Sequence, residues 1–137
     1  FSSRRRHTRY ISVTGVQTCA LPILGEALGR AVSTWAGDEK VLVLGTGGLS
    51  HQLDGERAGF INKRFDLEFM DSLAANPRWA TRFNTFELVE QTGTQGVELL
   101  MWLAARGALG EGARELHRNY HIPISNTASG LMLFEPA

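Results

Sequence analysis

The sequence is poor in cysteine, in long apolar runs and in net charge, and each shortage excludes a class of protein. Its single cysteine, Cys19, cannot form an intramolecular disulfide. The longest wholly apolar run, 99–105, is far shorter than the roughly 20 residues that a membrane-spanning helix needs. The 14 basic and 14 acidic residues leave no excess of positive charge to bind nucleic acid. We therefore expect neither a membrane nor a nucleic-acid partner.

Residues 1–23 have little of what a folded segment needs: apolar periodicity, helix caps and strand alternation are all missing. Val13–Ile23 can be encoded without a break by the read-primer part of a common short-read sequencing adapter. Ser3–Arg9 can be encoded by the flow-cell end of the same adapter, in the right order and spacing. The basic stretch "RRRHTR" would otherwise suggest a nuclear-localisation or transit signal. We interpret residues 1–23 as translated adapter, expect them to be disordered, and exclude them from the fold.

Excluding this segment changes what the composition implies. Four of the 14 basic residues and none of the 14 acidic residues lie within it, which leaves residues 24–137 with a net charge of −4. Cys19 also lies within it, so the remainder has no thiolate for a disulfide or a metal. We expect residues 24–137 to be the C-terminal part of one domain, read from a truncated gene.

The apolar patterning of residues 24–137 predicts an α/β fold, with a central sheet flanked by helices. The first helix is expected to bury a face formed by Leu24, Leu28, Ala31, Val32 and Trp35. The run Val41–Leu44 is continuous and bounded by turns, which predicts a buried strand in a parallel sheet. Caps and periodicity predict helices over 24–35, 66–73, 76–83 and 94–106, the last capped by Thr94 and stopped by Gly107, and two further strands over 121–125 and 130–136.

A glycine-rich stretch, "GTGGLSHQ", follows the predicted strand and carries His51. It lacks the third glycine of a dinucleotide fingerprint and the Gly-Lys-Ser/Thr of a P-loop, so nucleotide binding is disfavoured. Residues just beyond a strand of an α/β sheet line the crevice where ligands bind. His51 is therefore a candidate acid/base residue, because imidazole exchanges protons near neutral pH. The alternative is a turn histidine bonded to nearby carbonyls.

Glu98 lies in the first turn of the predicted helix 94–106, directly before the apolar run 99–105. A helix that is apolar all round is buried all round, and a carboxylate in such surroundings is costly unless it is paired or bound to a metal. An acid in a first turn is also favoured by the helix dipole and can simply be exposed there. The residues alone leave these two interpretations open.

His117 and His121 are four residues apart, the spacing of two metal ligands on one helix face. Together with Glu98 they would form a two-histidine, one-carboxylate set. Pro123 follows directly, however, and the residue before a proline is disfavoured in a helix. We interpret both histidines as structural or surface residues.

Three stretches together resemble the class III extradiol ring-cleavage dioxygenases, the family of the protocatechuate 4,5-dioxygenase β subunit and the gallate dioxygenases. They are "GTGGLSHQLDGERAGFINKRFDLEFMDSL", "GTQGVELLMWLAARGAL" and "YHIPISNTASGLMLF", and they cover nearly all of residues 24–137. The resemblance implies the C-terminal portion of that family's α/β fold.

The resemblance also implies a chemistry. Enzymes of this family hold a non-haem Fe(II) with two histidines and one glutamate, and they cleave an ortho-diphenol with O2. The histidine of the "SHQ" block is their acid/base residue and corresponds to His51, and the iron-binding glutamate corresponds to Glu98. The two histidine ligands belong to upstream segments that this chain lacks. The resemblance further implies a cytoplasmic, oligomeric enzyme, with a small α subunit in some members.

The substrate stays open at this point. Gln95 stands where the protocatechuate enzymes tend to carry an acid, three residues before the ligand. The spelling of residues 55–60 is closer to the gallate enzymes, whereas "INK" and the "SNTA" block are closer to the protocatechuate enzymes. A dioxygenase for another catechol, such as a dihydroxyphenylpropionate, and a non-catalytic binding module of the same fold are the alternatives. As written, the chain is expected to be inactive, because it has one of three iron ligands.

Overall fold

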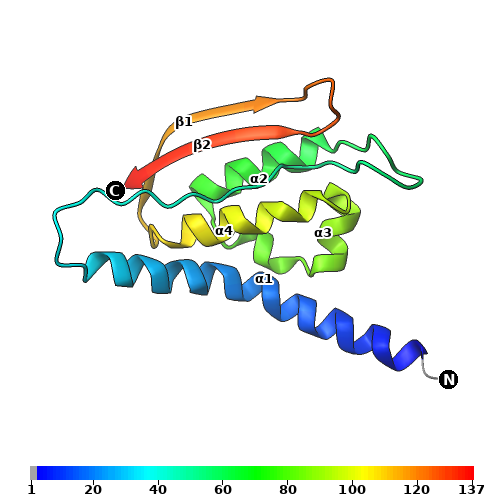
Figure 1. Cartoon of the computed structure of the whole chain (residues 1–137), viewed down its shortest axis with the longest axis horizontal. Coiled ribbons are helices and arrows are strands. Elements are labelled where there is room, and N and C mark those ends of the chain that lie inside the picture. Colours follow the sequence, from blue (N-terminus) through cyan, green and yellow to red (C-terminus); the bar gives the residue numbers. More distant parts are fainter. Residues whose placement is uncertain (1–2) are drawn as a thin grey trace.

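The computed structural model describes residues 3–137, with side chains from residue 18 onward. Figure 1 shows a layered arrangement in which a β-hairpin lies along α2, α4 lies below α2, and α1 runs along the other side of α4. The elements are α1 (Ser3–Ser33), α2 (Lys63–Ala75), η1 (Trp79–Arg82), α3 (Thr85–Thr92), η2 (Gly96–Leu99), α4 (Leu100–Gly107), β1 (Ala113–His121) and β2 (Ser129–Pro136). The predicted α/β class is confirmed. Within the described part of the chain, no helix is long and apolar enough to cross a membrane.

Helix α1 begins at Ser3 and so includes most of the segment that was expected to be disordered. The helix is continuous with the predicted helix 24–35, which ends at Ser33. Two side chains from the earlier segment, Thr18 and Pro22, are buried. The helix therefore continues across residue 23, and residues that precede this position contact the rest of the molecule. The adapter interpretation concerns the coding sequence of this segment, which the fold does not test, and it stays a prediction.

The buried face of α1 is not the apolar face that the sequence predicted. Leu24 and Trp35 are 62% and 67% exposed. The contact with α4 is made instead at Gly25 and Gly29, where a Cβ atom would lie 2.0 Å from the carbonyl oxygen of Ala104 and 2.2 Å from that of Ala108. Two glycines four residues apart let the helix backbones approach more closely than leucine side chains would allow.

The predicted strand Val41–Leu44 is wrong. The segment forms no strand, and Leu42 and Leu44 are 70% and 73% exposed. A buried parallel strand needs hydrogen-bonded neighbours, and among the described residues this segment has none. An apolar groove of about 780 Å³ lies between it, α4 and β2.

The sheet of the described residues is a two-stranded antiparallel hairpin of β1 and β2. The strand predicted over 130–136 is confirmed as β2. The strand predicted over 121–125 is wrong, because β1 ends at His121, where the register pairs it with Ser129. Pro123 has no N–H to donate to a ladder, and Ile124 is fully exposed. A bulge interrupts β1 between Glu115 and His117.

Helix α2 contains the predicted helix 66–73 and extends beyond it at both ends. Its N-cap is Asn62, whose side chain accepts a hydrogen bond from the backbone of Phe65. The helix predicted over 76–83 is wrong: Asn76 is the C-cap of α2, and only the short η1 follows. Around η1 the aromatic side chains pack against one another, and no regular α-helix forms there.

Two further corrections concern the segment before α4. Helix α3 was not predicted, although Asn84 and Glu87 form a reciprocal capping box at its start. The helix predicted over 94–106 begins instead as η2 and becomes α-helical at Leu100. Thr94 does not cap it, because its hydroxyl donates to the side chain of Gln95. The predicted end at Gly107 is confirmed.

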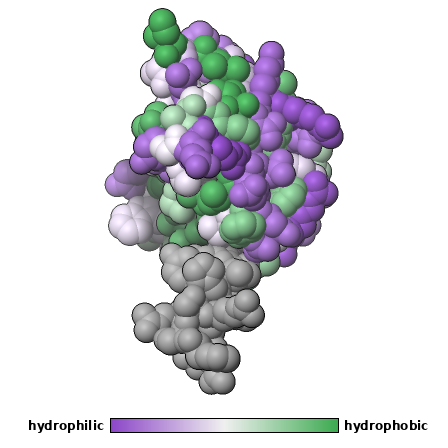
Figure 2. All heavy atoms as spheres, turned by 90° about the vertical axis from the view of Figure 1, so that its right-hand side faces the viewer, coloured by the Kyte–Doolittle hydropathy of each residue, from purple (hydrophilic) through white to green (hydrophobic). Residues whose placement is uncertain are grey.

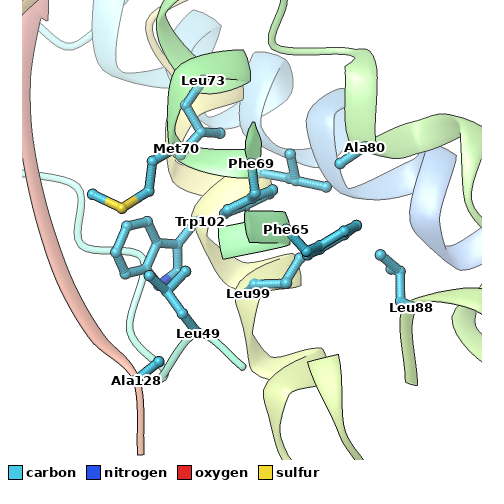
Figure 3. Packing of buried hydrophobic residues seen from close by; sticks show 11 residues of the cluster. Leu49, Phe65, Phe69, Met70, Leu73, Ala80, Leu88, Leu99, Trp102 and Ala128 are labelled. Atoms are coloured by element: carbon cyan, nitrogen blue, oxygen red, sulfur yellow. The ribbon is translucent and has the colours of Figure 1, made fainter. Parts of the chain in front are cut away.

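The hydrophobic core lies mainly between α2 and the η2–α4 segment, as Figure 3 shows. Phe69 of α2 packs against Trp102 of α4, with ring centroids 6.3 Å apart. Leu49 and Ala128 close the core where the glycine-rich loop meets the start of β2. The indole N–H of Trp102 donates to the carbonyl of Gly47 at 3.0 Å. The core thereby fixes the glycine-rich loop, residues 45–48, against the start of α4.

Candidate active site

His51 follows the glycine-rich loop and is 5% exposed. Its backbone N–H donates to the carbonyl of Thr92 at 2.7 Å, and it forms an isolated bridge with Thr127. Its ring atom Nδ1 lies 2.8 Å from the carbonyl oxygen of Leu49. Because a carbonyl only accepts hydrogen bonds, Nδ1 carries the proton of the neutral ring. That tautomer leaves Nε2 as a proton acceptor, which is the state that a general base needs.

Glu98 lies in η2 and is exposed. Of the two interpretations that its sequence position allowed, the structure supports the exposed first-turn carboxylate. The run that follows is not buried all round, since Met101 is 43% exposed. Oε2 of Glu98 accepts a hydrogen bond from the backbone N–H of Gly48 at 3.0 Å. The carboxylate is thus oriented by the loop while staying open on its other side.

The glycine-rich loop brings the two predicted site residues together. A Cβ atom on Gly47 would lie 2.6 Å from Cβ of Glu98, and one on Gly48 would lie 2.9 Å from Cε1 of His51. Gly47 also has a φ of 127°, which favours glycine. Glu98 and His51 therefore both lie next to the glycine-rich loop, Glu98 at Gly47 and Gly48 and His51 at Gly48, where there is no room for a Cβ atom.

A buried carboxylate, Asp66, lies beneath this loop and was not singled out from the sequence. It accepts hydrogen bonds from the backbone N–H of Ser50 at 2.8 Å, from the Ser50 hydroxyl at 2.6 Å and from the Tyr120 hydroxyl at 2.8 Å. The Ser50 hydroxyl in turn accepts from the backbone N–H of Asn62 at 2.7 Å. The signal that could have found it is an acid in the first turn of an otherwise apolar helix face.

Burial raises the pKa of Asp66, while its hydrogen bonds from Ser50 and Tyr120 and the nearby His51 oppose that rise. Burial also raises the pKa of the Tyr120 phenol, and Asp66 adds to that effect. Tyr120 is therefore a stable hydrogen-bond donor, and its partner is a carboxylate in a low-dielectric environment.

The remaining candidates do not join the site. His117 and His121 are exposed on β1, a strand and not a helix, in agreement with their interpretation as surface residues. Gln95 contacts the loop after His51: its Oε1 accepts from the backbone N–H of Leu53 at 3.3 Å, and its Nε2 donates to Oδ1 of Asp54 at 3.4 Å. Gln95 thus braces this loop against the start of η2.

Figure 2 shows the face of the molecule that lies on the right in Figure 1, where hydrophobic and hydrophilic residues are mixed over the surface. Among residues whose side chains the structure describes, no three histidine, cysteine or acidic side chains converge on one point. Glu98 fits a metal only as a single ligand, because it offers one hard carboxylate with a free oxygen.

Comparison with known proteins places this α/β chain among the ring-opening dioxygenases of aromatic compounds. The chain belongs to the family of catalytic LigB subunits of aromatic ring-opening dioxygenases, which matches residues 7–130. The predicted resemblance is confirmed. The match also includes part of the segment 1–23.

Two curated relatives support this membership. A gallate dioxygenase from Pseudomonas putida is 37% identical over 110 residues, which are 80% of this chain and 32% of the relative. A 2,3-dihydroxyphenylpropionate/2,3-dihydroxicinnamic acid 1,2-dioxygenase from Xanthobacter autotrophicus is 27% identical, in a match that covers 82% of this chain and 51% of the relative. The chain therefore spans about a third and about half of the lengths of these relatives.

Proposed function

We propose that this chain is part of an Fe(II)-dependent dioxygenase that cleaves a carboxylated ortho-diphenol, such as gallate or protocatechuate, beside its two hydroxyl groups. The observation that carries the proposal is that Gly48 adjoins both residues, by its hydrogen bond to Glu98 and by its close approach to the ring of His51. Membership of the LigB family and the likeness to a gallate dioxygenase support it. We place the reaction in the complete protein, in the cytoplasm, as an oligomeric enzyme with a small α subunit as a partner.

His51 is the acid/base residue of this proposal. Its Nδ1 is held by the Leu49 carbonyl, so Nε2 is available to take a proton from a substrate hydroxyl. The same nitrogen can return that proton as the ring opens, when both atoms of O2 have entered the product. Burial of the ring keeps bulk water from competing for this exchange.

Glu98 would hold the iron, together with two histidines that the resemblance places outside this chain. The bound iron would bring the diphenol and O2 into contact and make their reaction accessible. The hydrogen bond from Gly48 orients the Glu98 carboxylate before any metal binds. That prior orientation reduces the cost of forming the site.

A dioxygenase for another catechol is the second candidate, because one curated relative is named for dihydroxyphenylpropionate. Oxygen uptake by the complete protein, measured with gallate, protocatechuate and 2,3-dihydroxyphenylpropionate, distinguishes the candidates. We expect uptake and a ring-opened product with a carboxylated ortho-diphenol. The 137-residue chain assayed in parallel should bind Fe(II) weakly and consume no oxygen. Robust uptake by this chain alone would overturn the ligand assignment, and absence of uptake by the complete protein with every catechol would favour a binding module.

A further inference from the structure

A single peptide group connects Asp66 to the ring of His51. This group joins Leu49 to Ser50. Its N–H donates to Oδ1 of Asp66 at 2.8 Å, and its C=O accepts from Nδ1 of His51 at 2.8 Å. The peptide is trans, so its N–H and C=O point in opposite directions. The carboxylate of Asp66 therefore bonds to the positive end of this peptide dipole, and the imidazole of His51 bonds to its negative end.

This arrangement has a direct electrostatic consequence. A carboxylate that accepts from a peptide N–H polarises the group and makes its carbonyl a better acceptor. The stronger acceptor favours a proton on Nδ1, because only a protonated Nδ1 can donate to it. It also fixes the plane of the peptide and hence the direction in which the ring lies.

The surroundings of Asp66 hold the carboxylate in place for this purpose. It is fully buried, and Oδ2 accepts from the hydroxyls of Ser50 and Tyr120, which leaves Oδ1 to the peptide. The peptide segment is fixed from its other side as well, since Leu49 and Ser50 exchange backbone hydrogen bonds with Ala128 at 2.9 and 3.1 Å. Rotation of the Leu49–Ser50 peptide group would break its bonds to Asp66 and to His51, while Ala128 holds the peptide groups on either side of it.

We propose that Asp66 is a positioning residue for His51, acting through the Leu49–Ser50 peptide group to keep the proton on Nδ1 and Nε2 free. The proposal rests on the proposed role of His51 as acid/base residue. The hydrogen bonds of Asp66 with Ser50 and Tyr120 do not by themselves imply this role.

The test is the protonation state of the His51 ring in the 137-residue chain, read from long-range ¹H–¹⁵N NMR spectra. A His51→Gln variant identifies the signals of this histidine. We expect the Nδ1–H form to predominate in the neutral ring of the unmodified chain, and to fall below half in Asp66→Asn. Asp71→Asn is the matched control, since Asp71 lies on the same helix but is exposed and pairs with Arg118. It should leave the ring unchanged.

Two results would overturn the proposal: a predominantly Nε2–H ring in the unmodified chain, or an unchanged ring in Asp66→Asn. If Asp66→Asn does not fold, titration of the unmodified chain decides. The Nδ1 signal of His51 should then shift in the transition that the Asp66 carboxyl carbon and the Ser50 amide nitrogen report, and an Nδ1 signal that does not move in that transition would refute the coupling. The described titratable groups that act on Asp66 are Tyr120, by its hydrogen bond, and His51, by its charge.

The complete enzyme supplies a second readout. Asp66→Asn should lower kcat by about tenfold or more and leave KM for the diphenol and the iron content nearly unchanged, because Asp66 is buried and acts through the peptide group. An equal loss of iron would indicate a merely structural role. Failure of the proposed function would appear as inactivity of the unmodified enzyme, whereas the protonation state of His51 would still report on Asp66.

Discussion

The backbone N–H of Gly48 donates to the carboxylate of Glu98 at 3.0 Å, across 50 residues of sequence. This hydrogen bond ties the glycine-rich loop to the start of η2. A side chain on the same glycine would collide with the ring of His51, because its Cβ would lie 2.9 Å from Cε1. One residue without a side chain thus adjoins both groups to which the proposed chemistry is assigned.

Gly48→Ala should therefore disturb the loop and the ring of His51. The added Cβ would lie 2.9 Å from Cε1 of His51 and 3.1 Å from Cγ2 of Thr127, so the loop or the ring must move. We expect a loss of about 1–3 kcal/mol in the free energy of unfolding, measured by urea denaturation. Gly112→Ala is the control, because its Cβ would meet nothing closer than 3.5 Å. Equal stability of the two variants would show that the loop has more room than the distances indicate.

The sequence was sufficient where local chemistry decides the structure. The end of α4 at Gly107, the strand β2 and the presence of α2 were all predicted from caps and apolar patterning. His51 was singled out for a local reason too, because residues that follow a strand of an α/β sheet line the crevice where ligands bind, and its role in catalysis stays a prediction. Its ring tautomer depends on the Leu49 carbonyl and became visible only in the fold.

The failures have one physical origin, which is that burial is decided by partners distant in sequence. Val41–Leu44 has the composition of a buried strand, but no described strand pairs with it. The leucines of α1 have the spacing of a core face, but close contact at Gly25 and Gly29 turns them outward. Asp66 has the sequence position of an exposed first-turn acid, but it is buried and bonded to Ser50 and Tyr120, which are distant in sequence.

The proposed roles of His51 and Glu98 predict different defects in the complete enzyme. His51→Ala should lower turnover by about 10²–10⁴-fold and keep the iron, because an acid/base group contributes to the proton transfers alone. Glu98→Ala should lose iron, and turnover with it. Metal analysis and oxygen uptake on the same samples separate the two. His117→Ala and Glu111→Ala, at exposed positions, are the matched controls. Full iron occupancy in Glu98→Ala would refute its role as a ligand.

The adapter interpretation predicts the outcome of reading the source locus across the junction at Ile23 with long reads. Residues 1–23 should be absent from the genomic sequence, and an upstream coding segment with two histidine-bearing regions should take their place. The continuity of α1 from Ser3 to Ser33 does not decide the matter, since helix formation requires no native origin. If the genome contains the junction as written, the iron site is incomplete, and this result would favour the binding-module alternative.

The buried carboxylate predicts how stability depends on pH. Burial raises the pKa of Asp66 above its ordinary value of 3.8. Between that value and the raised one, the folded chain binds the proton more tightly than the unfolded chain does. The contribution of Asp66 is therefore fully present below 3.8 and is lost as the pH rises through the folded pKa.

Asp66→Asn should remove this dependence, so that the stability difference between unmodified chain and variant shrinks as the pH rises through that window. Urea unfolding at intervals from about pH 3.5 to pH 7 measures the difference. The hydrogen bond from Arg118 lowers the pKa of Glu115, so Glu115 contributes a pH dependence of stability with the opposite sign. Both chains share this contribution, and it cancels in the difference between their free energies of unfolding. Asp38→Asn, at an exposed position, should show the slope of the unmodified chain. A difference that grows with pH would mean that the hydrogen bonds from Ser50 and Tyr120 outweigh the cost of burying the charge.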